Sequence, residues 1–273
     1  MREKKKFHNP NLNHKGSLYG AFKTETGDWI IAAKNVNCYL LIGQTKAMLI
    51  DTAYGEGDLR AVVESITDLP IVIVNTHGHL DHSGGNAFWQ EVFMGHGGEK
   101  PARALEKKKK KNFADPNFDI LYLEDGQVFD LGDREVEAIA IGAHHGSSFA
   151  FLDHKNSTLY TGDEIESGQV LLFASGEAIS ERILVARHLE NMQKLYKRRS
   201  EFNRLMPSHN GAPISVDYIE DYMELAKLII KGEAKPENTI AGYGLSTLFG
   251  WGDKKLVRFR FGKASFIMSK KYI

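Results

Sequence analysis

Residues 75–85 read NTHGHLDHSGG, which places three histidines and one aspartate within six consecutive positions. The apolar run IVIVN at 71–75 leads directly into this stretch and predicts a buried strand. Because side chains alternate along an extended chain, His77 and His79 are expected to project to the same side. These two imidazoles are therefore placed to bind one metal ion.

Asp81 and His82 are expected on the turn that follows, where Gly84 and Gly85 permit tight backbone geometry before a helix that begins near Asn86. A single histidine is most often a surface residue, so a polar turn of exposed histidines is the alternative interpretation. Four such side chains after a buried strand are electrostatically unfavourable without a cation, and both residue types are common metal ligands. The cluster favours a metal site, with Asp81 and His82 available to a second ion.

One short motif cannot complete a metal site, so further ligands are expected from other strand ends at the same edge of a sheet. Three later stretches carry a candidate ligand beside a glycine: GAHHGSS (142–148), TGDE (161–164) and MPSHNG (206–211). Each stretch is a weak signal by itself. His145, His154 and Glu164 are equally consistent with ordinary surface residues.

The composition is that of a soluble globular protein with no strong overall charge. The chain has 273 residues, of which 42% are hydrophobic, and 35 basic residues balance 35 acidic ones. This balance provides no global field for binding nucleic acid or an anionic membrane. No apolar run approaches the roughly 20 residues of a membrane helix, and no apolar segment follows the basic start, so we expect a cytoplasmic protein. The single Cys38 is expected to be a small buried residue without a disulfide.

Short apolar runs bounded by turn or charged residues dominate the first part of the chain. They predict strands at 29–33, 38–43, 47–51, 71–75, 136–142, 148–153 and 158–163. Residues 57–69 show helical spacing behind Asp58, which predicts a helix and hence a strand–helix–strand unit. The pattern is that of a protein with mixed helices and strands.

The last third of the chain changes character. Two amphipathic patterns predict helices at 180–199 and 215–232, and the stretches LVRFRF and SFIMS predict a hairpin across Gly262. The lysine run at 107–111 is expected on a solvated helix and loop, with a patch for an anionic substrate as the alternative. The aromatic residues of 241–252 (Tyr243, Phe249 and Trp251) are expected either to pack structurally or to form a wall of a substrate pocket.

With its His-x-His-x-Asp-His motif, a later histidine, an aspartate after a strand and a final histidine, the sequence resembles the metallo-β-lactamase superfamily over about residues 30–213. The resemblance implies an α/β (α+β) fold, a four-layered αββα sandwich. It implies a single domain spanning 1–273, whose part from 178 to 273 covers the active-site edge. It also implies a ligand set: His77, His79 and His144 for one metal, Asp81, His82 and His209 for the other, and Asp163 bridging the two.

The third ligand of the first metal is ambiguous. Counting back from the strand FAFLD aligns Ser148 with the family's serine and His144 with its ligand. Counting back from Gly146-Ser147 instead places Ala143 there, so His145 is kept as the substitute. Asp51 matches a family aspartate that lies behind the metal loop and orients ligands, although it is also typical of a residue capping a turn.

Two divalent ions roughly 3.5–4 Å apart share a water, lower its pKa and present hydroxide to an electrophile. We therefore expect a binuclear metal-dependent hydrolase, with zinc preferred over iron or manganese and with Asp81 also handling a proton. The expected substrate is a small ester, thioester or lactone, with neither nucleic acid nor membrane as a partner. The alternatives are a phosphodiesterase or nuclease of the same fold, an iron-dependent oxidoreductase resembling persulfide dioxygenases, and a non-catalytic metal-binding scaffold.

Overall fold

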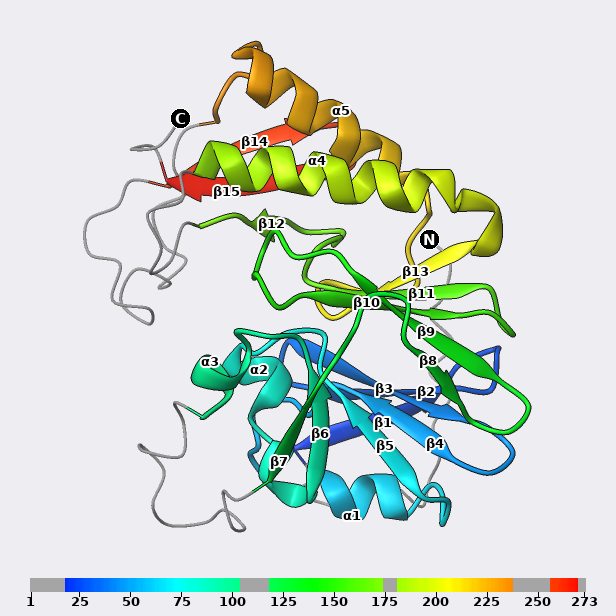
Figure 1. Ribbon diagram of the computed structural model, residues 1–273. Coiled ribbons are helices and arrows are strands. Elements are labelled where there is room, and N and C mark those ends of the chain that lie inside the picture. The colour runs from blue at the N-terminus through cyan, green and yellow to red at the C-terminus, as the bar shows by residue number, and fades with distance from the viewer. Residues whose placement is uncertain (1–17, 104–117, 174–180, 238–255, 270–273) are drawn as a thin grey trace. The chain divides into compact units, whose positions relative to one another are not determined.

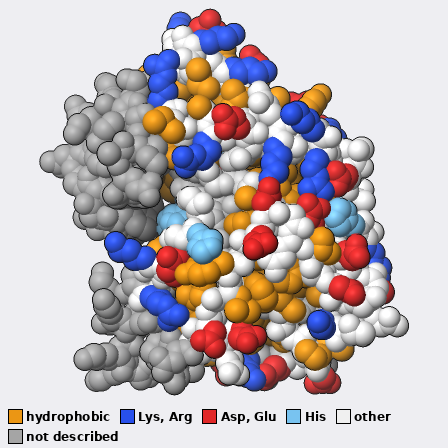
Figure 2. Space-filling model, viewed as in Figure 1, with side chains coloured by type: hydrophobic (Ala, Val, Ile, Leu, Met, Phe, Trp, Pro, Cys, Tyr) orange, Lys and Arg blue, Asp and Glu red, His pale blue; other side chains and the backbone are white. Residues whose placement is uncertain are grey.

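The computed structural model describes residues 18–103, 118–173, 181–237 and 256–269 (Figure 1). The chain divides into two compact units, the first formed by residues 1–140 and 146–160 and the second by 141–145 and 161–273. On the face shown in Figure 2, acidic and basic side chains are interspersed, as expected from the balanced composition. Within the described ranges, no helix is long and apolar enough to cross a membrane.

The first unit contains a seven-stranded mixed sheet. Its strands follow chain order: β1 (Tyr19–Lys23), β2 (Trp29–Ala33), β3 (Val36–Ile42), β4 (Ala47–Ile50), β5 (Ile71–Val74), β6 (Glu91–Met94) and β7 (Asp119–Tyr122). The pairs from β1 to β4 are antiparallel, whereas those from β4 to β7 are parallel. The carboxyl ends of β4, β5, β6 and β7 therefore meet at one edge of the sheet.

Helix α1 (Leu59–Glu64) makes the crossover from β4 to β5 and completes the predicted strand–helix–strand unit. The side chain of Asp58 caps it by accepting a hydrogen bond from the Ala61 amide. Leu59 and Val63 are buried in the same core cluster as alternate residues of β2, β3 and β4. The helix ends earlier than predicted, because Thr67 accepts a hydrogen bond from the Leu69 amide and so begins a turn before β5.

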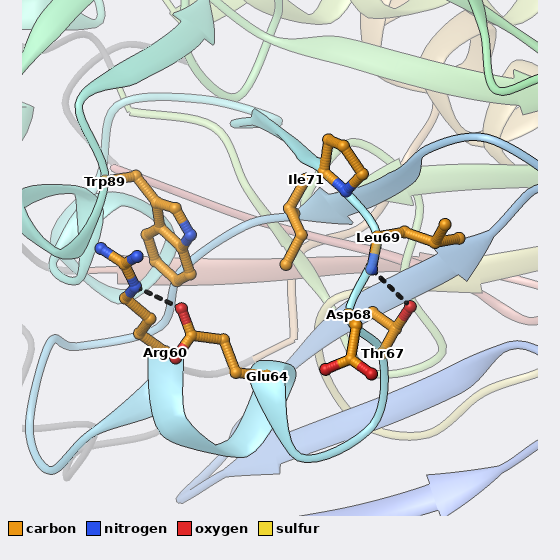
Figure 3. A pocket seen from close by; sticks show the side chains of 8 residues that line it. Arg60, Glu64, Thr67, Asp68, Leu69, Ile71 and Trp89 are labelled. Atoms are coloured by element: carbon orange, nitrogen blue, oxygen red, sulfur yellow. Dashed lines mark hydrogen bonds and ion pairs between the residues drawn. The ribbon is translucent and has the colours of Figure 1, made fainter.

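A surface hollow of about 410 Å³ lies beside α1 (Figure 3). Arg60, Glu64, Ile71 and Trp89 are among its lining residues. Ile71 begins β5, so the hollow lies at the amino end of that strand, whereas the histidine motif follows the carboxyl end. The Arg60 guanidinium is 2.6 Å from Glu64, and the two side chains form an ion pair in the wall of the hollow. The hollow is therefore separate from the candidate metal centre.

A second sheet in the first unit lies against the other face of the first. It contains β8 (Val128–Asp130), β9 (Glu135–Ala140), β10 (Phe149–Asp153) and β11 (Thr158–Gly162), all antiparallel. The rings of Tyr39 and Tyr160 pack between the sheets with centroids 4.9 Å apart. Strand β4 is consequently buried on both faces, which explains its continuous apolar sequence. Cys38 is buried as predicted, and burial raises the pKa of its thiol.

Buried charges also join the two sheets of the first unit. The guanidinium of Arg134 lies 2.6 Å from a carboxylate oxygen of Asp28 and 2.6 Å from one of Asp153. Burial alone would lower the pKa of Arg134, but the hydrogen bonds and charges of the two carboxylates raise it overall. Removing either carboxylate would leave a buried charge only partly compensated.

The prediction that a helix begins near Asn86 is wrong. Helix α2 (Leu80–Ser83) starts directly after His79, and only the single 3₁₀ turn η1 (Asn86–Phe88) follows. A Cβ atom at Gly84 would lie 2.4 Å from the Tyr54 carbonyl carbon, so the glycine pair lets the chain pack against the turn after β4. The side chain of Asn86 is held by that of Asn75 at 2.8 Å. Asp81 and His82 therefore lie on a helix and not on a turn.

The second unit is built on two helices and a small sheet. Its elements are β12 (Val170–Leu171), α4 (Glu181–Lys197), η2 (Arg199–Glu201), β13 (Arg204–Pro207), α5 (Tyr218–Lys231), β14 (Leu256–Phe261) and β15 (Ala264–Ser269), whereas α3 (Glu99–Arg103) belongs to the first unit. The predicted helices and the hairpin across Gly262 are confirmed, the latter with a φ of 54° at the glycine. Helix α5 ends at Gly232, whose φ of 76° and the bond from the Glu233 amide to the Leu228 carbonyl form a C-terminal cap.

The lysine run at 107–111 and the aromatic stretch 241–252 lie outside the described residues. Their expected roles stay predictions. The single domain over 1–273, and the placement of its last part over an active-site edge, also stay predictions.

Candidate metal centre

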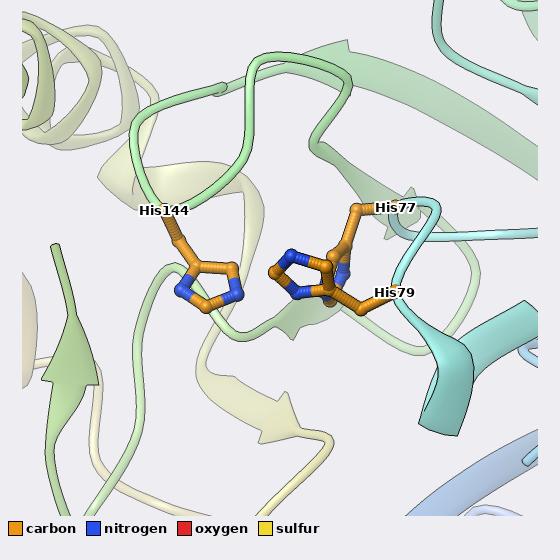
Figure 4. Close-up of side chains that lie close together, drawn as sticks. All are labelled: His77, His79 and His144. Carbon is orange, nitrogen blue, oxygen red and sulfur yellow. The ribbon is translucent and has the colours of Figure 1, made fainter. Parts of the chain in front are cut away.

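The histidine motif follows β5 at the carboxyl edge of the parallel strands. His77 and His79 turn toward one another (Figure 4), with Nε2 of His77 2.9 Å from Nδ1 of His79. Gly78 lies between them, and a Cβ atom there would be 2.2 Å from the Gly98 carbonyl oxygen. Only glycine allows this close backbone approach, which fixes the path of the loop and thereby the direction of both imidazoles.

The carboxylate of Asp51 orients the imidazole of His82. Its Nδ1 lies 2.8 Å from Oδ2 of Asp51, and the same carboxylate accepts hydrogen bonds from the amide and hydroxyl of Thr76. Because a carboxylate accepts hydrogen bonds, Nδ1 carries the proton and Nε2 offers a lone pair. That Nε2 is 3.7 Å from Oδ1 of Asp81. This is the arrangement by which a carboxylate fixes the tautomer of a metal-binding histidine.

In the second unit, three of the predicted ligands converge. His144 lies on the loop after β9 (Figure 4), Asp163 follows β11, and His209 follows β13. Nε2 of His144 is 3.6 Å from Oδ2 of Asp163, whereas Nε2 of His209 is 3.4 Å from Oδ1. Each oxygen of the Asp163 carboxylate thus faces a different histidine, as expected of a carboxylate shared between two ions.

The tautomer of His144 is set by the backbone. Its Nδ1 lies 2.7 Å from the Leu171 carbonyl oxygen. A carbonyl can only accept a hydrogen bond, so Nδ1 carries the proton and the lone pair of Nε2 faces Asp163. His145 is on the same loop and is half-buried.

Glu164 is a residue whose role the sequence did not reveal. Instead of lying at the surface, it is buried, and its Oε1 accepts hydrogen bonds from the amides of Ala143 and His144, each 2.9 Å long. Its carbonyl accepts a hydrogen bond from Nε2 of His188. Burial lowers the pKa of His188 to about 4, so this imidazole is neutral. Through its two hydrogen bonds from the amides, Glu164 holds the loop that carries His144.

His154 behaves as a surface residue. Its side chain is 38% exposed, and its Nε2 pairs with Glu137 at 3.2 Å. It lies outside the motif and is more exposed than the motif histidines, which makes His154 a reference for them.

The donor sets suit divalent ions. The imidazole nitrogens of His82, His144 and His209 lie 3.4–3.7 Å from carboxylate oxygens, beyond the usual hydrogen-bond range of about 2.7–3.2 Å. Two ligands about 2.1 Å from a tetrahedral ion stand about 3.4 Å apart. All donors are nitrogen or oxygen, which suits zinc and also accepts iron or manganese. The spacing of these three pairs therefore fits a divalent ion, with Asp81 and His82 in the first unit and Asp163, His144 and His209 in the second.

Comparison with known proteins identifies the family. Residues 32–235 match the model of the metallo-beta-lactamase superfamily. The chain belongs to this superfamily. The metallo-β-lactamase fold agrees with the mixed sheets and helices of the structure, so the predicted α+β class is confirmed. The superfamily is one of metallo-hydrolases, and relatives of the chain include hydrolytic enzymes.

Two of the relatives of this chain are named for the reactions that they catalyse. Acyl-coenzyme A thioesterase MBLAC2 of Homo sapiens is 23% identical over 210 residues, which cover 65% of this chain and 74% of that protein. Hydroxyacylglutathione hydrolase GloC of Haemophilus influenzae is 24% identical over 154 residues, 51% of this chain and 71% of that one. A solved metallo-β-lactamase from Pontibacter korlensis matches with a TM-score of 0.58 at 19% identity, covering 77% of this chain and 99% of that one. This last likeness shows the fold alone.

Proposed function

We propose that this chain is a thioester hydrolase that uses two divalent ions, zinc in the first instance. The observation that carries the proposal is the Asp163 carboxylate, whose two oxygens face His144 at 3.6 Å and His209 at 3.4 Å. In the proposed site, His77, His79 and His144 hold one ion, Asp81, His82 and His209 hold the other, and Asp163 is common to both. When bound, such ions lower the pKa of a shared water toward neutrality and polarise the substrate carbonyl.

The residues of the chain supply orientation and proton transfer. Asp51 and the Leu171 carbonyl fix the tautomers of His82 and His144, so that each presents Nε2 as a donor. The Asp81 side chain is 23% exposed, which leaves its carboxylate accessible from solvent. In the proposed reaction Asp81 takes the proton of the attacking water and returns it to the departing sulfur.

The choice of a thioester among possible acyl substrates rests on the relatives. The two described above act on an acyl-coenzyme A and on a hydroxyacylglutathione, both of which are thioesters. A thiolate leaves more readily than an alkoxide, so an activated water with modest proton transfer suffices. Phosphodiester hydrolysis is disfavoured by the equal numbers of acidic and basic residues, since polyanion-binding proteins usually carry a basic surface.

The test combines metal analysis with a substrate screen. Protein purified with no added ions and then loaded with zinc, manganese or iron is assayed on acyl-coenzyme A, a hydroxyacylglutathione, a lactone, a phosphodiester, a persulfide and a β-lactam. We expect about two equivalents of metal, with turnover of a thioester that falls at least a hundredfold in His79→Ala. His154→Ala is the matched control, because that histidine is exposed and paired with Glu137.

Turnover of the phosphodiester without the thioesters would overturn the proposal, and so would oxygen uptake with the persulfide. Full metal content and activity in His79→Ala would refute the ligand assignment. These outcomes separate the hydrolase from the oxidoreductase and from a scaffold that only binds metal.

A further inference from the structure

The parallel strands of the first unit present a series of side chains at one edge. Asp51 follows β4 and His77 follows shortly after β5. The next two strand ends along the same edge belong to β6 and β7, and they carry His96 and Tyr122. Ligands of α/β sheets bind at the carboxyl ends of parallel strands, so these two positions lie where a substrate is expected.

His96 and Tyr122 form a stacked pair of rings. Their centroids are 3.7 Å apart and their planes differ by 16°. His96 lies in the turn between Gly95 and Gly98, closed by the bond from the Gly98 amide to the Gly95 carbonyl. Tyr122 ends the edge strand β7, in register with Met94 of β6. Two independent backbone elements thus hold the rings parallel.

The pair is anchored beside the histidine motif. The turn that carries His96 ends at Gly98, whose carbonyl oxygen would lie 2.2 Å from a Cβ atom at Gly78. Gly78 separates His77 from His79, so the base of the turn touches the metal loop itself. The stack and the motif belong to the same compact unit.

The stack lies outside the buried core of the described residues. Tyr122 is 42% exposed and His96 is also exposed, so neither ring is part of the buried core. Parallel rings that remain open to water offer a flat polarisable surface, on which a further planar ring stacks favourably. Nucleotide bases are planar groups that proteins bind in this way, by stacking on aromatic side chains.

We propose that the His96–Tyr122 stack binds the purine base of a thiol that carries a nucleotide, so that the substrate is an acyl thioester of the coenzyme A type. This inference rests on the proposed thioester hydrolysis and adds its substrate class. Glutathione has no aromatic ring and would gain nothing from the stack. The stack would therefore favour a coenzyme A thioester, the substrate named for one relative, over a glutathione thioester, the substrate named for the other.

The kinetic test compares two substrates with the same acyl group, one on coenzyme A and one on N-acetylcysteamine, which has no nucleotide. We expect Tyr122→Ala and His96→Ala to lower the preference for the coenzyme A thioester, as the ratio of the two kcat/KM values, by roughly tenfold through KM. Tyr122→Phe keeps the ring and should keep the ratio. Tyr196→Ala is the matched control, since Tyr196 is an exposed tyrosine (45%) on α4.

A binding measurement keeps this inference separate from the proposed function. Calorimetric titration of the zinc-loaded protein with adenosine 3′,5′-bisphosphate should show binding that weakens about tenfold in Tyr122→Ala. Binding that is equal in both proteins, or a kcat/KM ratio unchanged by the two alanine variants, would show that the His96–Tyr122 stack does not bind the base. If the unmodified protein binds the bisphosphate but hydrolyses no thioester, the proposed function is wrong and the role of the stack in binding the base still stands.

Discussion

Nδ1 of His82 lies 2.8 Å from Oδ2 of Asp51, and both side chains are buried. The carboxylate also accepts hydrogen bonds from the amide and hydroxyl of Thr76, so a single group connects the end of β4, the loop after β5 and helix α2. The backbone of Asp51 has a φ of 65°, which is uncommon for a residue with a side chain. This conformation, together with the buried partners, indicates that the position serves the orientation of His82.

Replacing Asp51 with asparagine should weaken metal binding more than it weakens the fold. The amide has nearly the same shape, but it removes the charge that supports a protonated Nδ1 on His82. We expect a 10- to 100-fold loss of zinc affinity, measured by competition with a chelator, while the circular dichroism spectrum is unchanged. The control is Asp68→Asn, because Asp68 is exposed. Equal zinc affinity in Asp51→Asn and the unmodified protein would show that the pair is only structural.

The two candidate third ligands can be separated by single replacements. The hydrogen bond from His144 to the Leu171 carbonyl fixes its Nε2 lone pair toward Asp163. His144→Ala should therefore lose about one of two equivalents of zinc and at least a hundredfold in turnover, whereas His145→Ala should retain both ions. Zinc content by mass spectrometry is the measurement. If His145→Ala loses the ion and His144→Ala does not, the ligand is one residue further along the chain.

Those residues of the candidate site that form a local motif could be predicted from the sequence. His77, His79, Asp81 and His82 are adjacent in the chain, and their residue types alone suggest metal binding. The helical state of Asp81 and His82 could not be predicted, because it depends on how closely the glycines pack against the turn after β4.

Other features were missed because they depend on partners distant in the sequence. Glu164 resembles a surface residue until the loop at Ala143 and His144 supplies its two amide donors. Strand β7 has exposed residues at three of its four positions and so lacks the apolar alternation that identifies a strand. Pairing with β6 defines it, and this pairing is a property of the folded sheet.

Glu164 should affect the metal site through backbone position. Its Oε1 accepts both amide hydrogens at 2.9 Å, and Glu164→Gln keeps a carbonyl oxygen that can accept them. Glu164→Ala leaves the buried Ala143 amide and the half-buried His144 amide without this acceptor, which costs about 1–3 kcal/mol in stability. We expect zinc affinity to fall about tenfold in the alanine variant and little in the glutamine variant. A zinc affinity that falls equally in both variants would mean that the negative charge, and not the acceptor, is what matters.

His188 should make the fold less stable in acid. It is fully buried beside the rings of Tyr222 and Phe266, and burial lowers its pKa to about 4. In the unfolded chain the pKa is about 6.5, so both states are neutral above pH 7, and below that the unfolded state takes up the proton first. Stability therefore falls as the pH drops from about 6.5 to about 4, by about 2 kcal/mol at pH 5.

The contribution of His188 is measured by a difference. His188→Gln keeps an N–H donor for the Glu164 carbonyl but does not titrate, so its free energy of unfolding should change less between pH 7 and pH 5. Both proteins are freed of metal with a chelator and unfolded with urea at pH 7 and at pH 5, which gives four free energies of unfolding. Protonation of the other histidines contributes equally to both proteins and cancels in the difference. We expect the unmodified protein to lose about 2 kcal/mol more than the variant. An equal loss would mean that the imidazole takes up its proton within the fold, and that the cavity around it admits water.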